Sequence, residues 1–116
     1  MALPSSPLAV NKVRLFSVGD IPVPAVYATH RIIRDCNVAF AQVFAATREE
    51  IVGRSFSRLY PQIEDFIERG AHWAANFSGQ RTYRDERVMA RLNGERFWCR
   101  VSGRSLSESR DPFEKA

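Results

Sequence analysis

The side chains best suited to chemistry in this sequence are two cysteines and two histidines, Cys36, Cys99, His30 and His72. Thiolates and imidazoles are common zinc ligands and common nucleophiles or bases. No carboxylates cluster beside these residues, and both cysteines fall on predicted strands, where a small buried thiol is the usual state. His30 falls in a predicted turn. We therefore expect two reduced thiols, a solvated His30 and no metal site.

Ser55 and Ser57 are the remaining candidates for a nucleophile. Neither has the flanking glycines of a nucleophile elbow, and the sequence indicates no histidine partner for them. We therefore expect no enzymatic activity.

The composition is that of one soluble domain. The chain has 116 residues, of which 45% are hydrophobic and 26% charged. It contains no run of about 18 apolar residues that could span a membrane. The N-terminal sequence M-A-L-P-S-S-P lacks the basic start and apolar core of a secretory signal. These features predict a cytoplasmic location and no membrane contact.

The net charge of +4 raises the question of nucleic-acid binding. The arginines, however, are spread from Arg14 to Arg110 and are mostly interleaved with acidic residues. There is no basic run, no zinc spacing and no helix-turn-helix pattern. We therefore expect a mixed, solvated surface and no direct nucleic-acid contact.

The segment 37–61 contains the clearest local signals, and the rest of the chain is expected to pack against it. Asn37 is a candidate N-cap for a short helix that presents Phe40 on its apolar face. Thr47 and Glu50 have the spacing of a capping box, which predicts a second helix. Gly53 then fits a left-handed helix stop.

Ahead of this segment we expect a short helix and then a strand pair. Ser6 and Pro7 fit the start of a helix that runs to about Ser17 and presents Val13 and Phe16. The apolar face of this helix is too narrow for the helix to fold alone, so we expect it to dock on another protein surface. Strands are predicted at 25–29 and 32–36, around a turn at His30 and Arg31.

A longer helix and a hairpin complete the pattern. The helix is expected over 62–77, with a possible break at Gly70 and an apolar stripe made of Ile63, Phe66, Ile67, Ala71, Ala74 and Phe77. Strands at 82–92 and 95–105 flank Asn93-Gly94, a strong hairpin signal. Alternation places Glu86, Val88, Ala90 and Leu92 on one face of the first strand, and Phe97, Cys99 and Val101 on one face of the second.

This order of elements resembles the PAS sensor domain over about residues 20–110. The motifs that carry the resemblance are Asn37 with Phe40 (N-x-x-F), E-E-I-V-G ending at Gly53, the following L-Y-P, and N-G-E-R-F-W-C-R-V-S-G. The last is similar to the D/N-G-x-x-x-W strand pair of the family. The resemblance implies an α+β fold, with an antiparallel sheet that carries short helices on one face.

The family sheet has five strands, with the last in the middle, whereas four strands are readable here. Either the fifth strand is cut off and the chain is part of a longer protein, or the strand starts within 113–116. A missing central strand would leave rows of backbone groups unpaired. We expect residues 1–19 to form a tail and docking helix, and residues 20–116 to form the sensor domain.

The resemblance also implies a cavity for a cofactor or ligand. Photosensors of this family that use flavin have a reactive cysteine where this chain has Phe56, so we expect no such photochemistry. Haem-binding members use a histidine on the long helix, and His72 is the one candidate. Our alignment places the ligand position nearer Glu68, so we do not expect haem. The expected pocket residues are Phe40, Phe44, Phe56, Leu59, Phe66, Trp73, Val88, Phe97 and Cys99, although each one singly can also be ordinary core.

Two functions fit these expectations. In the first, a small ligand enters the pocket and shifts the sheet, and an output domain of the longer protein, DNA-binding or kinase, responds. Transcription control is the expected output. In the second, the pocket is filled by its own side chains, and the module serves as a homodimer interface. Val13, Phe16 and Trp98 would form the dimer or relay surface.

Overall fold

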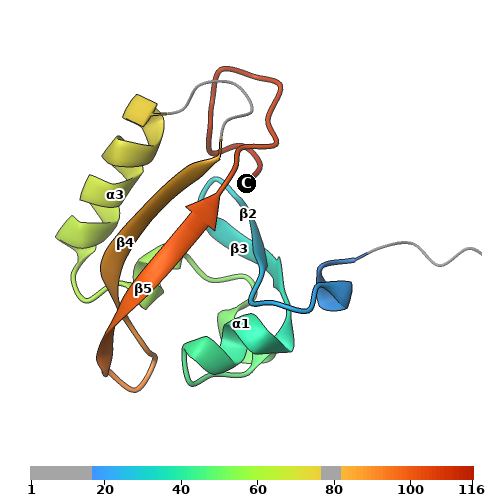
Figure 1. Cartoon of the computed structure of the whole chain (residues 1–116), viewed down its shortest axis with the longest axis vertical. Coiled ribbons are helices and arrows are strands. Elements are labelled where there is room, and N and C mark those ends of the chain that lie inside the picture. Colours follow the sequence, from blue (N-terminus) through green and yellow to red (C-terminus); the bar gives the residue numbers. More distant parts are fainter. Residues whose placement is uncertain (1–16, 77–81) are drawn as a thin grey trace, which may run out of the picture.

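The computed structural model describes residues 17–76 and 82–116 and has an α+β architecture (Figure 1). Its helical elements are the 3-10 helix η1 (Val18–Asp20), α1 (Val38–Val43), α2 (Arg48–Ile51), the 3-10 helix η2 (Phe56–Leu59) and α3 (Ile63–Asn76). Its strands are β2 (Val26–Thr29), β3 (Ile32–Cys36), β4 (Tyr83–Ala90) and β5 (Arg96–Gly103). The expected N-terminal helix, with Val13 and Phe16, lies outside the described residues.

The predicted turn between the first two strands is confirmed. β2 and β3 pair antiparallel, with Thr29 opposite Ile32. His30 and Arg31 have φ angles of 50° and 62°, so both residues are left-handed. Two left-handed residues are what a tight type I′ hairpin needs, and they are usually asparagine and glycine. Arg31 therefore occupies a conformation that arginine adopts rarely.

The two predicted helix caps are also confirmed. The Asn37 side-chain oxygen accepts hydrogen bonds from Phe40 N at 2.9 Å and from Ala25 N at 3.1 Å. Its amide nitrogen donates to the carbonyls of Ile21 at 3.0 Å and Val23 at 2.6 Å. One side chain thus starts α1 and holds the extended segment before β2.

The capping box of α2 forms as its spacing predicts. Thr47 N donates to the Glu50 carboxylate at 2.8 Å, and Glu50 N donates to the Thr47 hydroxyl at 3.3 Å. Gly53 follows with φ 89°. The chain then runs along β3, where Ile33 N donates to Arg54 O at 2.9 Å and Gly53 N to Ile33 O at 2.7 Å.

The helix α3 forms as predicted, but of its predicted inner stripe only Phe66 packs against the core, and Phe77 lies outside the described residues. Ile67 is 62% exposed, and Ile63 is exposed too. The residues that contact the rest of the domain are Phe66, Arg69, Gly70 and Trp73. They follow helical spacing as well, and α3 continues through Gly70 without a break. The inner face of α3 therefore contains an arginine and a glycine, which a purely apolar stripe misses.

The hairpin of β4 and β5 shows a second correction, at Val88. Val88 lies opposite Trp98, whereas Met89 lies opposite Phe97. Opposite residues of an antiparallel pair share a face. Trp98 is 75% exposed and Val88 36% exposed, so Val88 belongs to the outer face. On β5 the predicted alternation holds, since Phe97, Cys99 and Val101 are less exposed than their neighbours.

The expectation of one continuous sheet is not met within the described residues, where β2–β3 and β4–β5 form two separate two-stranded sheets. No strand of that part of the chain lies between β2 and β5. On the free edge of β2, Ala28 and Ala116 exchange two backbone hydrogen bonds of 2.7 and 2.9 Å. His30 N also donates to Phe113 O at 2.6 Å. The end of the chain therefore lies against β2.

The core lies between the β2–β3 hairpin, the short helices and the inner face of β4. Its most deeply buried side chains are Ile33, Cys36, Ile51 and Leu59. α3 contacts both hairpins, because Arg31 stacks on Phe66 and Arg69 pairs with Asp85. In Figure 1, α3 runs alongside β4, and α1 lies at the end of the domain away from the C-terminus. Among the described residues, no helix is long and apolar enough to cross a membrane.

Candidate functional site

The main cavity has a volume of about 500 Å³ and lies between the two hairpins, under α3. Residues of β2, α1, η2, α3, β4, β5 and the C-terminal segment line it. Of the nine expected pocket residues, five line this cavity: Phe40, Phe44, Phe56, Trp73 and Cys99. Leu59, Phe66 and Phe97 belong to the core or pack against it, and Val88 lies on the outer face.

Phenylalanine rings form one wall of the cavity. The ring centroids of Phe40 and Phe44 are 5.0 Å apart, and those of Phe40 and Phe56 are 6.5 Å apart with nearly perpendicular planes. Phe97 supports this wall from behind, 5.5 Å from Phe44. Tilted and edge-on contacts of this kind stabilise aromatic pairs. The wall is therefore apolar and held by ring contacts from three elements.

Trp73 is a further aromatic residue of the cavity lining and is contacted by four neighbours. Its ring lies edge-on to Tyr83 at 5.7 Å and is stacked with Phe113 at 6.3 Å. Its indole N–H donates to Pro112 O at 3.3 Å. A Cβ on Gly103 would lie 2.6 Å from the indole ring. Gly103 thus gives the ring room to lie against β5.

A buried charged network borders the cavity, and the sequence analysis missed it. Arg87 donates from Nε and Nη2 to the carboxylate of Asp85, both at 2.8 Å, and from Nη1 to the Tyr60 hydroxyl at 2.5 Å. Asp85 also accepts from Arg69 Nη1 at 3.1 Å and from the Tyr83 hydroxyl at 2.8 Å. The alternation of Tyr83, Asp85 and Arg87 along β4 was the signal that could have revealed this face.

Burial changes the acidity of several groups in the domain. It raises the pKa of the Tyr83 hydroxyl, and the hydrogen bond to Asp85 raises that pKa further. Burial also raises the pKa of the Cys99 thiol and of the Cys36 thiol. Both thiols are free in the structure. A thiol with a raised pKa is a weak nucleophile at neutral pH.

The histidines take no part in the cavity. His72 is exposed on α3, and its backbone carbonyl accepts a hydrogen bond from Asn76 at 2.9 Å. Glu68 is exposed on the same helix. His30 lies 3.5 Å from Asp111 on the surface. Within residues 17–76 and 82–116, no group of three or more His, Cys, Asp or Glu side chains could hold a metal ion.

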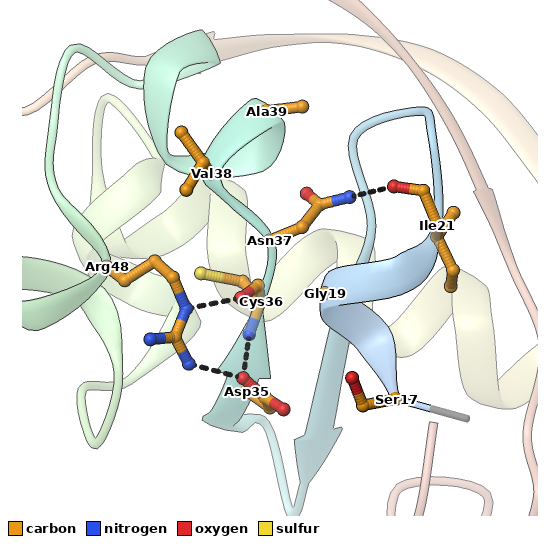
Figure 2. Close-up of a pocket in the computed structure, with 9 residues that line it drawn as sticks. All are labelled: Ser17, Gly19, Ile21, Asp35, Cys36, Asn37, Val38, Ala39 and Arg48. Carbon is orange, nitrogen blue, oxygen red and sulfur yellow. Dashed lines mark hydrogen bonds and ion pairs between the residues drawn. The ribbon is translucent and has the colours of Figure 1, made fainter. Parts of the chain in front are cut away.

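A second cavity of about 460 Å³ lies between η1 and the start of α1 (Figure 2). Arg48 donates there to the Asp35 carboxylate and to Cys36 O, both at 2.6 Å. The Asn37 amide is occupied by the bonds described above. The polar groups of this cavity thus bind each other, and we place the functional site in the first cavity.

The fold and the first cavity define a small α+β domain with an internal binding space, and comparison with known proteins identifies its family. A family profile described as the PAS domain matches residues 23–114. The chain therefore belongs to the PAS domain family and is a PAS sensory module.

Two relatives are about one-third identical to this chain in sequence. The PAS domain of a LuxR-family transcriptional regulator from Burkholderia thailandensis, solved in complex with ethanol, is 35% identical with a TM-score of 0.77, covering 84% of this chain and 86% of that one. Sensor protein TdiS of Thauera aromatica is 33% identical over 93 residues, which are 80% of this chain but only 17% of TdiS. The PAS domain of an HTR-like protein from Haloarcula marismortui shares the fold, with a TM-score of 0.56 and 18% sequence identity. The match covers 73% of this chain and 74% of that one.

Proposed function

We propose that this PAS module senses a small, largely apolar molecule in the main cavity. The observation that carries the proposal is the cavity itself, with a volume of about 500 Å³ and a wall of phenylalanine rings. A volume of this order is typical of small-molecule sites, which are lined mostly by apolar and aromatic side chains with a few polar groups.

The position of the cavity suggests how binding acts on the domain. Phe40 and Phe56 belong to the helical side, whereas Cys99 and Val101 belong to β5. A ligand that contacts both sides favours the arrangement in which both contacts are made. The domain is in equilibrium between this arrangement and one in which the contacts are not both made. The ligand shifts that equilibrium only to the extent that it binds the first arrangement more tightly than the second.

The output lies in a longer protein. The relatives are a PAS domain of a transcriptional regulator and a sensor protein of which this chain matches 17%. We accordingly propose a cytoplasmic role in transcription control or in a sensor kinase, with the output domain outside these 116 residues.

Native mass spectrometry of the protein as purified tests the sensing role. We expect a mass above that of the bare chain, which is lost on denaturation and whose difference gives the ligand mass. Trp73→Ala should release the ligand, because it removes the largest aromatic side chain that lines the cavity. Trp98→Ala is the matched control, since Trp98 lies on the outer face. A bare chain that gains no mass from added ligands would contradict the proposal.

A second function rests on a separate observation, the exposed Trp98. It lies opposite Val88 on the outer face of the β4–β5 hairpin, beside the ion pair of Glu86 and Arg100. A large exposed aromatic with an apolar neighbour is typical of protein interfaces. We propose that this face pairs with a second copy of the chain, and that the dimer relays the state of the cavity.

A further inference from the structure

The charges around the main cavity are strongly unbalanced. Its lining residues include five arginines and no aspartate or glutamate. The arginines are Arg31, Arg69, Arg87, Arg100 and Arg104. The electrostatic potential of an apolar cavity bordered by cations raises the local concentration of anions.

Some of these charges are already paired. Arg100 pairs with Glu86 on the outer face at 2.9 Å. Arg69 and Arg87 share one carboxylate, that of Asp85, at 3.1 and 2.8 Å. The buried Arg87 and the partly buried Arg69 therefore have one counter-ion between them.

Arg31 differs from these arginines. No carboxylate in the described part of the chain lies within ion-pair distance of it. Its guanidinium lies instead over the Phe66 ring, 3.6 Å from the centroid, and 5.3 Å from that of Phe113. Ring stacking occupies the faces of a guanidinium, whereas its five N–H donors point outward in its plane. The stacked group thus keeps donors for an acceptor in the cavity.

Two unfavourable local features coincide at this guanidinium. Arg31 has a φ of 62°, in the left-handed region that arginine disfavours. Gly70 stands inside α3, where glycine weakens a helix, and a Cβ there would lie 2.3 Å from Arg31 Nη1. Conformations of this kind tend to persist where function requires them. Both features lie at the same guanidinium, which favours a functional role for Arg31 in the site.

The surroundings of Arg31 favour an incoming anion. Burial lowers the pKa of the Arg31 guanidinium, and the nearby Arg87 cation lowers it too, although the Tyr60 hydroxyl acts in the opposite direction. An arginine remains charged in spite of such shifts. A negative group next to both guanidiniums relieves the cost of burial and the repulsion between them.

We infer that the ligand of this cavity carries a carboxylate on an apolar, ring-sized body, and that Arg31 binds this carboxylate beside Arg87 and the Tyr60 hydroxyl. The phenylalanine wall receives the apolar body. This inference rests on the proposed sensing function and adds the chemical class of the ligand. Because Arg31 also contacts α3 and the C-terminal Phe113, the ligand draws the first hairpin, the helix and the end of the chain together.

A matched pair of probes tests the inference by titration calorimetry on the 116-residue chain. The probes are 3-phenylpropanoate and its neutral counterpart 3-phenylpropan-1-ol. We expect the carboxylate to bind at least about tenfold more tightly, as a charge-assisted hydrogen bond implies. Arg31→Gln should remove this preference by lowering the affinity for the carboxylate. Arg34→Gln removes the same charge from the same hairpin at an exposed site and should keep the preference.

Gly70→Ala is a second variant, for use if Arg31→Gln does not fold. It keeps every charge but puts a methyl group where Nη1 lies, so the preference for the carboxylate should fall while alcohol binding persists. Equal affinities of the native chain for both probes, or a preference that survives Arg31→Gln, would overturn this inference and leave the sensing function standing. Binding of neither probe would overturn both.

Discussion

Asp85 and Arg87, two residues apart on the inner face of β4, are joined by two hydrogen bonds of 2.8 Å each. Their side chains are only 14% and 8% exposed. A buried ion pair of this geometry adds little over an apolar pair, but loss of one partner leaves the other charge without compensation. The pair therefore makes β4 intolerant of neutral substitutions at these two positions.

Asp85→Asn is expected to destabilise the domain by about 3 kcal/mol, because Arg87 and Arg69 lose their shared carboxylate. Urea unfolding followed by circular dichroism measures this free energy. Glu86→Gln, which breaks the exposed pair with Arg100, is the control and should change the stability by less than about 1 kcal/mol. Equal effects of the two variants would show that the Asp85 network contributes nothing beyond a surface pair.

Gly70→Ala is expected to bring none of the gain that alanine normally gives inside a helix, which is about 1 kcal/mol. The new methyl group would displace the Arg31 guanidinium from its place against α3. In an Arg31→Gln background the same change should stabilise the domain by about 0.5–1 kcal/mol. A double-mutant cycle of unfolding free energies measures this coupling. Additive effects would mean that Gly70 and Arg31 do not interact.

The stability of the domain is expected to fall as the pH rises above about 8.5, where free thiols in the unfolded chain begin to ionise. Burial raises the pKa of Cys36 and Cys99, so the folded chain keeps these protons longer than the unfolded chain. The unfolded state is then favoured increasingly at high pH. Unfolding titrations between pH 7 and 10 show the slope, and Cys36→Ala should reduce it. A stability that is flat over this range, or a slope unchanged by Cys36→Ala, would contradict the prediction.

Trp98→Arg is expected to weaken self-association at least about tenfold, since a charge in the centre of an apolar interface is costly. Analytical ultracentrifugation measures the dissociation constant. Val38→Arg changes another exposed apolar residue, on α1 and away from the outer face of the hairpin, and should leave association unchanged. If the native chain sediments as a monomer at high concentration, the dimer proposal fails and the sensing proposal is unaffected.

The local signals of the sequence predicted local structure well. The Asn37 cap, the Thr47–Glu50 capping box and the turn after β2 each depend on residues close in the chain, so their chemistry can be read directly. The Asn93-Gly94 signal likewise marks the turn of the second hairpin, where Gly94 has a φ of 91°.

Orientation relative to the core was harder to predict. Val88 and Ile67 were expected inside because they are apolar, but both face outward. The inner faces hold Asp85, Arg87 and Arg69, because the Asp85 carboxylate pairs with both arginines, and Arg69 lies 16 positions away from it in the sequence. The periodicity of hydrophobic residues cannot reveal an ion pair between two elements, such as that of Arg69 on α3 with Asp85 on β4. The charged side of the cavity was not predicted for the same reason.

The four hydrogen bonds of Asn37 have a mechanical consequence. They tie the carbonyls of Ile21 and Val23 and the amide of Ala25 to the first turn of α1. A pull applied to the chain ahead of Ile21 is therefore borne first by one amide side chain at the base of a helix. The hydrogen bonds between β2 and β3 bear the force only after the Asn37 hydrogen bonds break. Asn37 is therefore the residue through which tension from the N-terminal side reaches the domain.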